Sequence, residues 1–190
     1  MKEQFLQFLN LHTQLSETEF RAIEDIMSEK ELRKKEHLVK VNDICSEIVF
    51  FSEGYFRFYY YAKNGNEVTS DFYFGPGIVT SYTSFITDTP SNTYVQAMEE
   101  MKVLVINKLN LEKLYSRYHK IDRVGRLIAE KIAIYYEQHL LSILNQTAEE
   151  RYKNLLNNNP LFIQKIPLQY IASYLGITQE TLSRVRQKVK

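Results

Sequence analysis

The sequence predicts an α+β protein in which an antiparallel β domain with flanking helices precedes a long helix and a C-terminal pair of short helices. Three observations predict this. Residues 37–107 contain six short β-branched and aromatic runs, residues 120–145 have helical apolar periodicity without proline, and residues 167–186 have the pattern of two helices packed across a tight turn. The predicted domains are residues 1–119 for the β domain, 120–145 for the long helix and 146–190 for the C-terminal module.

Two short amphipathic helices are expected ahead of the β region, at residues 3–10 and 16–28. Ser16 is a candidate N-cap, and Glu19 completes a capping box. The strand-like runs that follow are HLVKV, EIVFF, YFRFYYYA, EVTSDFYF, TYVQAM and KVLVI. An Asn-Gly pair at residues 64–65 separates two of them and is a strong hairpin signal. Short strands at this spacing predict a small antiparallel barrel or sandwich.

The long helix at residues 120–145 spans about 38 Å at 1.5 Å per residue. Its apolar set is wider than one stripe, so one side can cover the β domain while another packs on a partner helix. We interpret the second side as a homodimer interface. The alternative is a single helix buried against its own domain. The residues predicted at the dimer interface are Ile121, Val124, Ile128, Ile132, Tyr135 and His139.

Charge is distributed unevenly along the chain. Residues 151–190 hold seven basic residues and one acidic residue, a net charge of +6, whereas the other 150 residues carry −5. This asymmetry indicates a small basic module that meets a polyanion, attached to an acidic body that does not. The alternative is a basic segment that is only solvated.

The basic module begins after the break at residues 157–160, and its motif is the stretch Pro167–Arg186. Pro167 suits a first helical turn, Gly176 permits a left-handed turn residue, and Thr178 can cap a second helix. The inward positions are Ile171, Ala172, Leu175, Ile177, Leu182 and Val185. The outward side chains of the second helix are polar and suited to base edges and phosphates; they are Gln179, Glu180, Ser183, Arg184 and Arg186. The pattern predicts a helix-turn-helix.

Together these features resemble the Crp/Fnr superfamily of bacterial transcription regulators, over essentially all 190 residues. The sharpest match is the run from Glu180 to Arg184, which fits the E-x-x-S-R signature of the family's recognition helix. The resemblance implies a β-roll of the double-stranded β-helix or jelly-roll type, a dimerisation helix and a helix-turn-helix. It also implies a homodimer on a palindromic operator in double-stranded DNA, with RNA polymerase as a further partner. The chain ends at Lys190, which leaves little room for a wing after the recognition helix.

Roles for single residues follow from the resemblance. Arg184 would donate two hydrogen bonds to a guanine, Glu180 would accept one from a cytosine, and Ser183 would contact a base or phosphate. Gln179 would tune the half-site, and Gln169 would contact a phosphate. The residues predicted to bind DNA are Gln169, Thr178, Gln179, Glu180, Ser183, Arg184, Arg186 and Lys188.

The family's cyclic-nucleotide cassette is incomplete in this sequence. The turn at residues 75–77 is kept, but Ser81-Tyr82 replaces the ribose-binding Gly-Glu, and Ser91 replaces the arginine that neutralises the cyclic phosphate. A phosphate buried without a cation would be poorly compensated, so cAMP is not the expected effector. Either the polar residues line a pocket for another small molecule, or they belong to a surface loop. The candidate pocket residues are Ser81, Tyr82, Thr83, Ser84, Ser91, Asn92 and Thr93.

Other chemistries find little support. The sequence has no glycine-rich phosphate loop, nucleophile elbow or cluster of metal-ligand residues, so we predict no catalytic residue, no metal, no cofactor and no enzyme activity. Cys45 is interpreted as a small buried residue rather than a redox thiol. The Tyr and Phe residues between 50 and 74 alternate as strand faces do, which favours core packing over base stacking.

No apolar run approaches the roughly 18–20 residues that span a bilayer, and the N-terminus does not resemble a signal peptide. With one cysteine, the chain is expected to be cytoplasmic and to have no membrane partner. The leading hypothesis is a sequence-specific DNA-binding transcription regulator. The alternative is a ligand-binding signalling module whose C-terminal helices contact protein instead of DNA.

Overall fold

A computed structural model describes residues 1–158 and 160–189. Two positions of the predicted C-terminal module, Asn159 and Lys190, lie outside the described residues. Contacts divide the chain into two compact units. The first comprises Met1–Tyr60 and Phe72–Glu130, and the second comprises Tyr61–Asp71 and the chain from Lys131 onward. The units cut across the predicted boundaries, because the tip of a β-hairpin and half of the long helix associate with the C-terminal helices.

The N-terminal helices are α1 (Lys2–Asn10) and α2 (Glu17–Glu24). The capping box is confirmed: the Ser16 hydroxyl accepts a hydrogen bond from the Glu19 amide, and the Glu19 carboxylate accepts one from the Ser16 amide at 2.8 Å. The prediction that the second helix reaches residue 28 was wrong. The helix ends at Glu24, and strand β1 (Met27–Leu32) begins three residues later, because it pairs along its whole length with a later strand.

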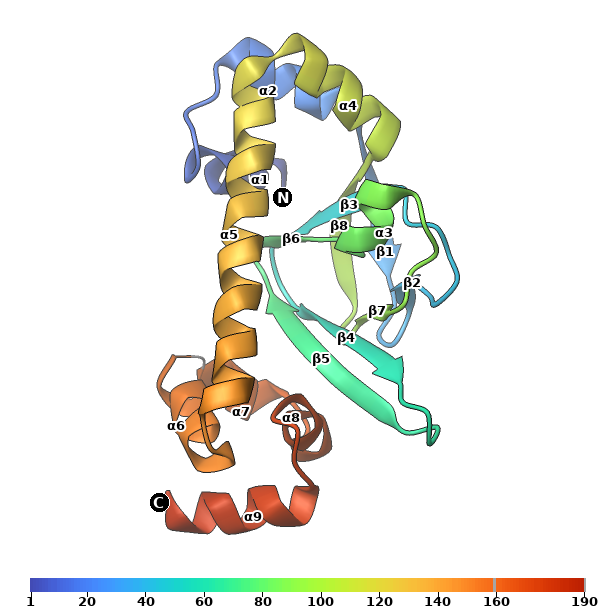
Figure 1. The fold of residues 1–190 in the computed structure, drawn as a ribbon. Helices are drawn as coiled ribbons and strands as arrows, with labels where there is room; N and C mark the ends of the chain where they lie inside the picture. The colour runs from blue at the N-terminus through green and yellow to red at the C-terminus, as the bar shows by residue number, and fades with distance from the viewer. Residues whose placement is uncertain (159, 190) are drawn as a thin grey trace. The chain divides into compact units, whose positions relative to one another are not determined.

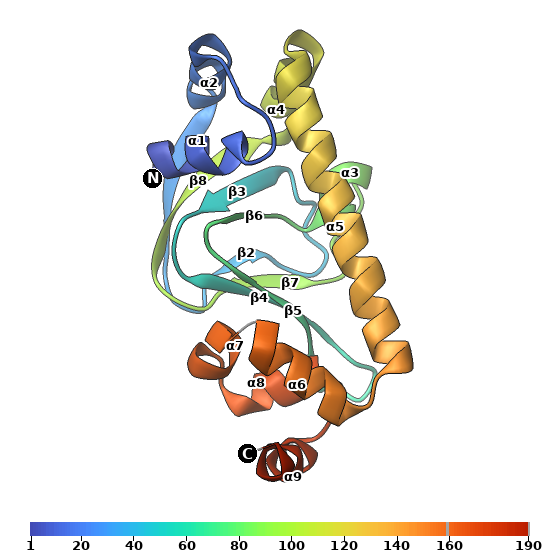
Figure 2. The same ribbon diagram turned by 90° about the vertical axis from the view of Figure 1, so that its left-hand side faces the viewer.

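Two four-stranded antiparallel sheets form the β domain, with strand orders β1-β8-β3-β6 and β2-β7-β4-β5 (Figures 1 and 2). This order is that of a jelly roll, which confirms the predicted β-roll. The remaining strands are β2 (His37–Val39), β3 (Glu47–Phe51), β4 (Tyr55–Tyr61), β5 (Glu67–Phe74), β6 (Gly77–Val79), β7 (Tyr94–Ala97) and β8 (Met101–Asn107).

The predicted hairpin joins β4 to β5. Gly65 has φ +82°, a conformation that glycine adopts without steric cost. The turn is closed by hydrogen bonds from the Ala62 amide to the Asn66 carbonyl and from the Gly65 amide to the Ala62 carbonyl, both 2.9 Å. The hairpin prediction is confirmed.

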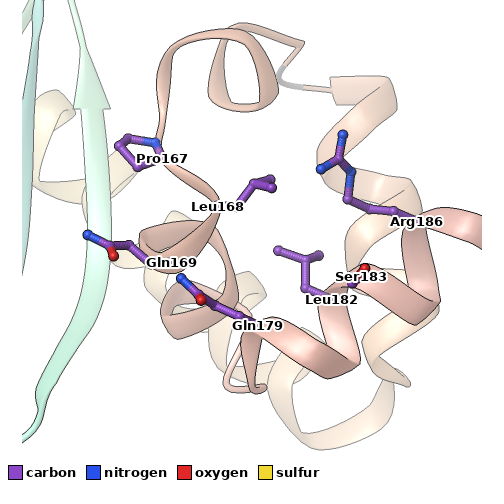
Figure 3. Close-up of a pocket in the computed structure, with 7 residues that line it drawn as sticks. All are labelled: Pro167, Leu168, Gln169, Gln179, Leu182, Ser183 and Arg186. Atoms are coloured by element: carbon purple, nitrogen blue, oxygen red, sulfur yellow. The ribbon is translucent and has the colours of Figure 1, made fainter.

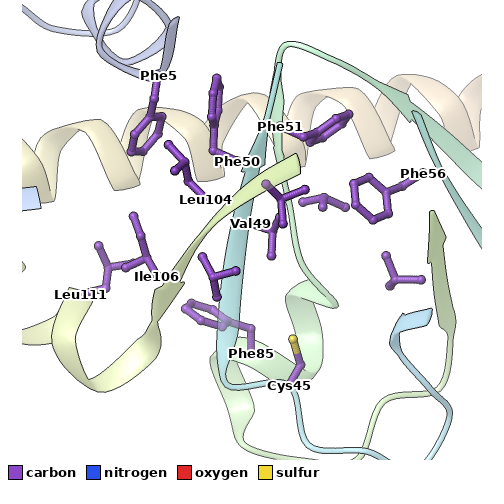
Figure 4. Close-up of a cluster of buried hydrophobic side chains, with 14 of the residues drawn as sticks. Phe5, Cys45, Val49, Phe50, Phe51, Phe56, Phe85, Leu104, Ile106 and Leu111 are labelled. Atoms are coloured by element: carbon purple, nitrogen blue, oxygen red, sulfur yellow. The ribbon is translucent and has the colours of Figure 1, made fainter. Parts of the chain in front are cut away.

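The core of the first unit is built from aromatic and branched side chains of β3, β4 and β8 (Figure 4). Phe5 of α1 lies 4.6 Å from Phe50 between ring centroids, and Phe51 meets Phe56 edge-on at 4.9 Å. Cys45 is buried in the same cluster. The interpretation of Cys45 as a small buried residue is confirmed, and that of the aromatic runs as core is confirmed except at Tyr60 and Tyr61, which are exposed.

The remaining helices are α3 (Tyr82–Thr87), α4 (Lys108–Arg117), α5 (His119–Asn145), α6 (Ala148–Asn158), α7 (Pro160–Lys165), α8 (Leu168–Tyr174) and α9 (Gln179–Lys188). The long helix lies where the periodicity predicted it. Helix α3 was not predicted and occupies part of the expected loop. Within the described parts of the chain, no helix combines the length and the apolar character needed to cross a membrane.

Candidate nucleic-acid interface

Helices α8 and α9 form the predicted pair across a tight turn. Pro167 is the N-cap of α8, where its missing N–H removes nothing the helix needs. Gly176 ends that helix with φ +69°, and the Ile177 amide returns to the Ala172 carbonyl at 3.0 Å. The Thr178 hydroxyl accepts a hydrogen bond from the Thr181 amide at 3.1 Å and so caps the start of α9. Each turn residue thus has the local role that its type predicts.

The apolar positions of the motif point inward as predicted. Ile171 is 0% exposed and Leu182 is 1% exposed, and both lie in the core beneath the two helices. Helices α6 and α7 complete this core. Its other buried members are Tyr152, Leu155, Phe162, Ile166, Ala172, Leu175 and Val185. Burial of this apolar face leaves the polar face of α9 toward solvent.

Arg151 has a role that sequence reasoning did not predict. One guanidinium nitrogen donates to the Gln146 carbonyl just past α5 at 2.6 Å, and another donates to the Leu175 carbonyl at the end of α8 at 2.7 Å. These carbonyls belong to helix ends that lack intrahelical partners. Arg151 therefore holds the turn of the helix pair in place and is not available to bind a polyanion. Nothing in its local sequence distinguishes it from the solvated basic residues.

A groove of about 570 Å³ opens between the start of α8 and the exposed face of α9 (Figure 3). Four residues predicted to bind DNA line it together: Gln169, Gln179, Ser183 and Arg186. Pro167, Leu168 and Leu182 form its apolar part. Amides, a hydroxyl and a guanidinium around one concave surface suit the oxygen atoms of a phosphate backbone.

Glu180 and Arg184 lie one turn apart on α9 and form an ion pair with each other. Their side chains are 75% and 71% exposed, so the pair contributes little to stability. Both can exchange this contact for base edges with small energetic cost. Of the other predicted residues, Thr178 caps α9 and Lys188 is exposed near its end. The structure thus brings four of the predicted residues together at the groove and places the other four along α9 and at its N-cap.

The prediction of Ile121 and Val124 at the dimer interface is wrong, whereas that of the half-buried Ile128, Ile132, Tyr135 and His139 stays a prediction. Ile121 and Val124 are buried in the core of the first unit, and Ile128 packs against that core. Tyr135 donates a hydrogen bond to Asp71 of β5 at 2.8 Å, and His139 stacks on a tyrosine of α8. This side of the helix packs against its own chain, because its apolar side chains find partners there.

A different side of α5 is open. Ile134, Leu141 and Leu144 are 54%, 49% and 68% exposed. Periodicity indicated two apolar sides but could not tell which one the chain covers itself. Ile132, also predicted at the dimer interface, is half-buried. The exposed apolar side of α5 is therefore the surface available for a second helix.

His139 lies among Tyr135 on its own helix, Tyr174 on α8 and Arg151 on α6. Burial, aided by the positive charge of Arg151, lowers the pKa of His139. The unfolded chain then binds this proton more readily than the folded chain. The stabilising effect of neutral His139 is present above about pH 6.5 and is lost as the pH falls through the folded-state pKa.

We therefore expect the second unit to lose stability between pH 7.5 and pH 5.5, and we expect His139→Gln to lose less over the same interval. Hydrogen exchange of α8 at the two pH values, corrected for intrinsic exchange, measures the difference. Equal losses in both proteins would show that His139 does not titrate as its environment requires.

The candidate effector residues have several different environments. The Ser81 and Ser91 hydroxyls are buried and hydrogen-bonded to each other at 2.8 Å, and Ser91 also donates to the Thr93 carbonyl at 2.8 Å. The Ser84 hydroxyl accepts a hydrogen bond from the Cys45 amide at 2.9 Å. The other three residues, Tyr82, Thr83 and Asn92, are exposed.

The buried serines thus tie α3 to the following loop. A cavity of about 380 Å³ in this unit has a different lining, made by residues 38, 39 and 43–47. Among the described residues, no group of three or more His, Cys, Asp or Glu side chains is arranged to hold a metal ion.

Comparison with known proteins agrees with this geometry. The family model described as "Cyclic nucleotide-binding domain" matches residues 29–118. No curated protein matches the sequence. Among solved structures, FixK2 from Bradyrhizobium japonicum is similar with a TM-score of 0.72 and 19% identity, covering 86% of this chain and 84% of that one.

Two further solved structures extend the likeness. A regulator assigned to the Crp/Fnr family from Eubacterium rectale has a TM-score of 0.71 at 15% identity, covering 92% of this chain and 83% of that one. The c-di-GMP-responsive global regulator CLP from Xanthomonas campestris has a TM-score of 0.70 at 11% identity, and the match covers 92% of this chain and 91% of that one. Residues 29–118 thus match the cyclic nucleotide-binding domain, and the chain has the fold of Crp/Fnr-type transcription regulators.

Proposed function

We propose that the protein is a homodimeric, sequence-specific DNA-binding transcription regulator of the Crp/Fnr type, with α9 as its recognition helix. The observation that carries the proposal is the arrangement of α8 and α9. Their apolar faces are buried, whereas Glu180, Ser183 and Arg184 are exposed on α9 beside the polar groove. A helix of this kind enters the major groove, where side chains can reach base edges.

In this proposal, different residues contact the bases and the phosphates. Arg184 donates two hydrogen bonds to a guanine, and Glu180 accepts one from a cytosine amino group. Their mutual ion pair holds both side chains on one face of α9 before DNA binds. Gln169 and Arg186 at the groove contact the phosphate backbone and fix the register of α9, and Gln179, which also lines the groove, tunes the half-site.

A homodimer is proposed because one helix of this length reads only a half-site. The exposed side of α5 supplies the surface, with Ile134 and Leu141 separated by the seven residues that place both on one seam of paired helices. A two-fold dimer would place two α9 helices on half-sites about one helical turn of DNA apart. RNA polymerase is the proposed further partner.

We infer that any effector of the β domain is not cAMP bound through a cassette arginine. Ser91 stands at the position where that arginine is expected, and its hydroxyl is already bonded to Ser81 and to the Thr93 carbonyl. A signal at this domain would act by changing the packing of α5 and so the spacing of the two α9 helices, which is a shift between two populated arrangements.

Selection of bound sequences from a random DNA pool tests the proposal. Wild type and Arg184→Ala are compared at the same salt concentration. We expect wild type to enrich a palindrome, and we expect the variant to lose selectivity at a G·C pair in each half-site, by about 1–3 kcal/mol. Arg184→Lys is the matched control, since it keeps the charge and loses the bidentate fork.

Enrichment of an asymmetric site, or an identical palindrome from all three proteins, would contradict the assigned roles. No enrichment together with no binding to any duplex at low salt would favour a protein partner for the C-terminal helices.

A further inference from the structure

Three elements of the second unit meet at a polar cluster, which consists of the buried Asp71 on β5 and the half-buried Tyr135 and His139 on α5 and Tyr174 on α8. The Tyr135 hydroxyl donates to Asp71 Oδ1 at 2.8 Å. The His139 ring is nearly parallel to the Tyr135 ring, with a centroid distance of 6.1 Å and an interplanar angle of 6°. It also stacks on the Tyr174 ring, with a centroid distance of 5.2 Å and an interplanar angle of 24°. The cluster therefore joins the hairpin strand, the long helix and the first helix of the helix-turn-helix.

A second contact runs beside the cluster. The Thr69 amide of β5 donates to the Ser173 hydroxyl of α8 at 2.8 Å. Phe162 of α7 also packs on Tyr174, with ring centroids 5.7 Å apart. Helix α8 is thus held by a backbone group of β5 as well as by side chains of α5 and α7.

The chemistry of the cluster links the carboxylate of Asp71 with the two tyrosines. Asp71 is 1% exposed, and a buried carboxylate is costly unless it accepts hydrogen bonds. Burial and the charge of Asp71 raise the pKa of Tyr135 well above its usual range and that of Tyr174 to about 12. Both phenols therefore remain protonated at neutral pH, and Tyr135 remains a donor to the carboxylate.

Strand β5 carries residues of both units. Glu67–Asp71 belongs to the second unit, whereas Phe72–Phe74 belongs to the first. In the first unit, the Tyr55 ring contacts the rings of Phe72 and Phe74, with centroid distances of 6.2 and 4.8 Å.

We propose that Asp71, Tyr135 and Tyr174 are positioning residues for DNA binding, which hold α8, and through the Gly176 turn α9, in fixed register with β5 and α5. The proposal rests on the proposed function for its consequence at DNA. A loosened α8 makes the two α9 helices of a dimer sample wrong spacings, which weakens binding to the palindrome while phosphate contacts remain. Specific binding falls, and non-specific binding does not.

The test combines hydrogen exchange of residues 168–175 with DNA affinity in variants of the full chain. Tyr135→Phe removes only the hydroxyl that binds Asp71, and the control Tyr60→Phe removes the same atom from an exposed tyrosine of β4. We expect Tyr135→Phe to speed exchange of α8 about tenfold or more relative to wild type and Tyr60→Phe, since a hydrogen bond to a charged group is lost. Exchange in β3 and β8 should be unchanged.

The DNA readout is the ratio of affinities for the selected palindrome and for a shuffled duplex. We expect Tyr135→Phe to lower this ratio about tenfold with unchanged affinity for the shuffled duplex. Asp71→Ala should lower the ratio by the same factor. Asp71→Asn keeps an acceptor oxygen for the Tyr135 hydroxyl and should therefore keep most of the wild-type ratio. General destabilisation would reduce both affinities together, so the ratio separates positioning from folding.

Wild-type exchange of α8 in Tyr135→Phe would overturn the proposal whatever the DNA results. A wild-type affinity ratio in Tyr135→Phe and Asp71→Ala would overturn it while leaving the proposed function intact. If wild type itself does not distinguish the two duplexes, the proposed function fails, and the consequence at DNA fails with it. If Tyr135→Phe does not fold, Ser173→Ala, which removes the acceptor of the Thr69 amide, replaces it with the same expected outcomes.

Discussion

Replacing Ile134 and Leu141 together by glutamate should convert the protein to a monomer and abolish tight binding to a palindrome. Both side chains are about half exposed, so the single chain tolerates the charges. In a two-fold dimer the same four carboxylates would face one another in a desolvated seam, which costs several kcal/mol. Affinity for the full palindrome should fall about 100-fold or more, because the second half-site no longer benefits from effective concentration.

Sedimentation equilibrium and titration of the selected duplex measure the two effects. The matched control is Ile134→Leu with Leu141→Ile, which exchanges one apolar shape for another and should stay dimeric. A glutamate variant that sediments as a dimer would place the interface elsewhere. A monomeric variant with wild-type affinity for the palindrome would show that dimerisation does not serve DNA binding.

Ile171→Ala should unfold the C-terminal helices while the β domain stays folded. Ile171 is fully buried between α8 and α9, and truncating a buried isoleucine costs about 2–5 kcal/mol. The net stability of a unit this small is of the same order, at roughly 0.05–0.15 kcal/mol per residue. Sequence-specific binding should disappear with the helices, since α9 packs on the core that Ile171 fills.

Hydrogen exchange by region measures this outcome. Residues 148–158 and 160–188 should lose protection in Ile171→Ala, and β3 and β8 should keep theirs. Leu168→Ala is the control on the same helix, because Leu168 is 43% exposed and its truncation opens little cavity. Equal effects of the two substitutions would mean that the apolar core between α8 and α9 does not hold the pair together.

Local signals account for the elements that the sequence predicted well. The capping box at Ser16 and the turn glycines Gly65 and Gly176 act within a few residues, so they can be read from one segment. The six strand runs were recognised because their β-branched and aromatic side chains supply the buried positions of the core. Strand β1 was missed because its sequence, MSEKEL, is mostly charged and polar and only Leu32 is buried.

The candidate site was predictable in part for the same reason. The polar face of α9 follows from helical spacing, since buried Leu182 and Val185 fix where Glu180, Ser183 and Arg184 point. The partners of α5 were not predictable. Which apolar side faces its own chain depends on contacts with residues far away in the sequence, such as Asp71 with Tyr135. The same holds for Arg151, whose acceptor at Leu175 lies 24 residues away.

Competition between the selected palindrome and a shuffled duplex of the same composition, titrated over a range of salt, tests the central claim most directly. A sequence-specific regulator should prefer the palindrome by about 10³-fold or more at physiological salt. Both affinities should fall steeply as salt rises, because phosphate contacts release counterions. A ratio near one at every salt concentration would contradict the account, and would mean that the exposed face of α9 does not read bases.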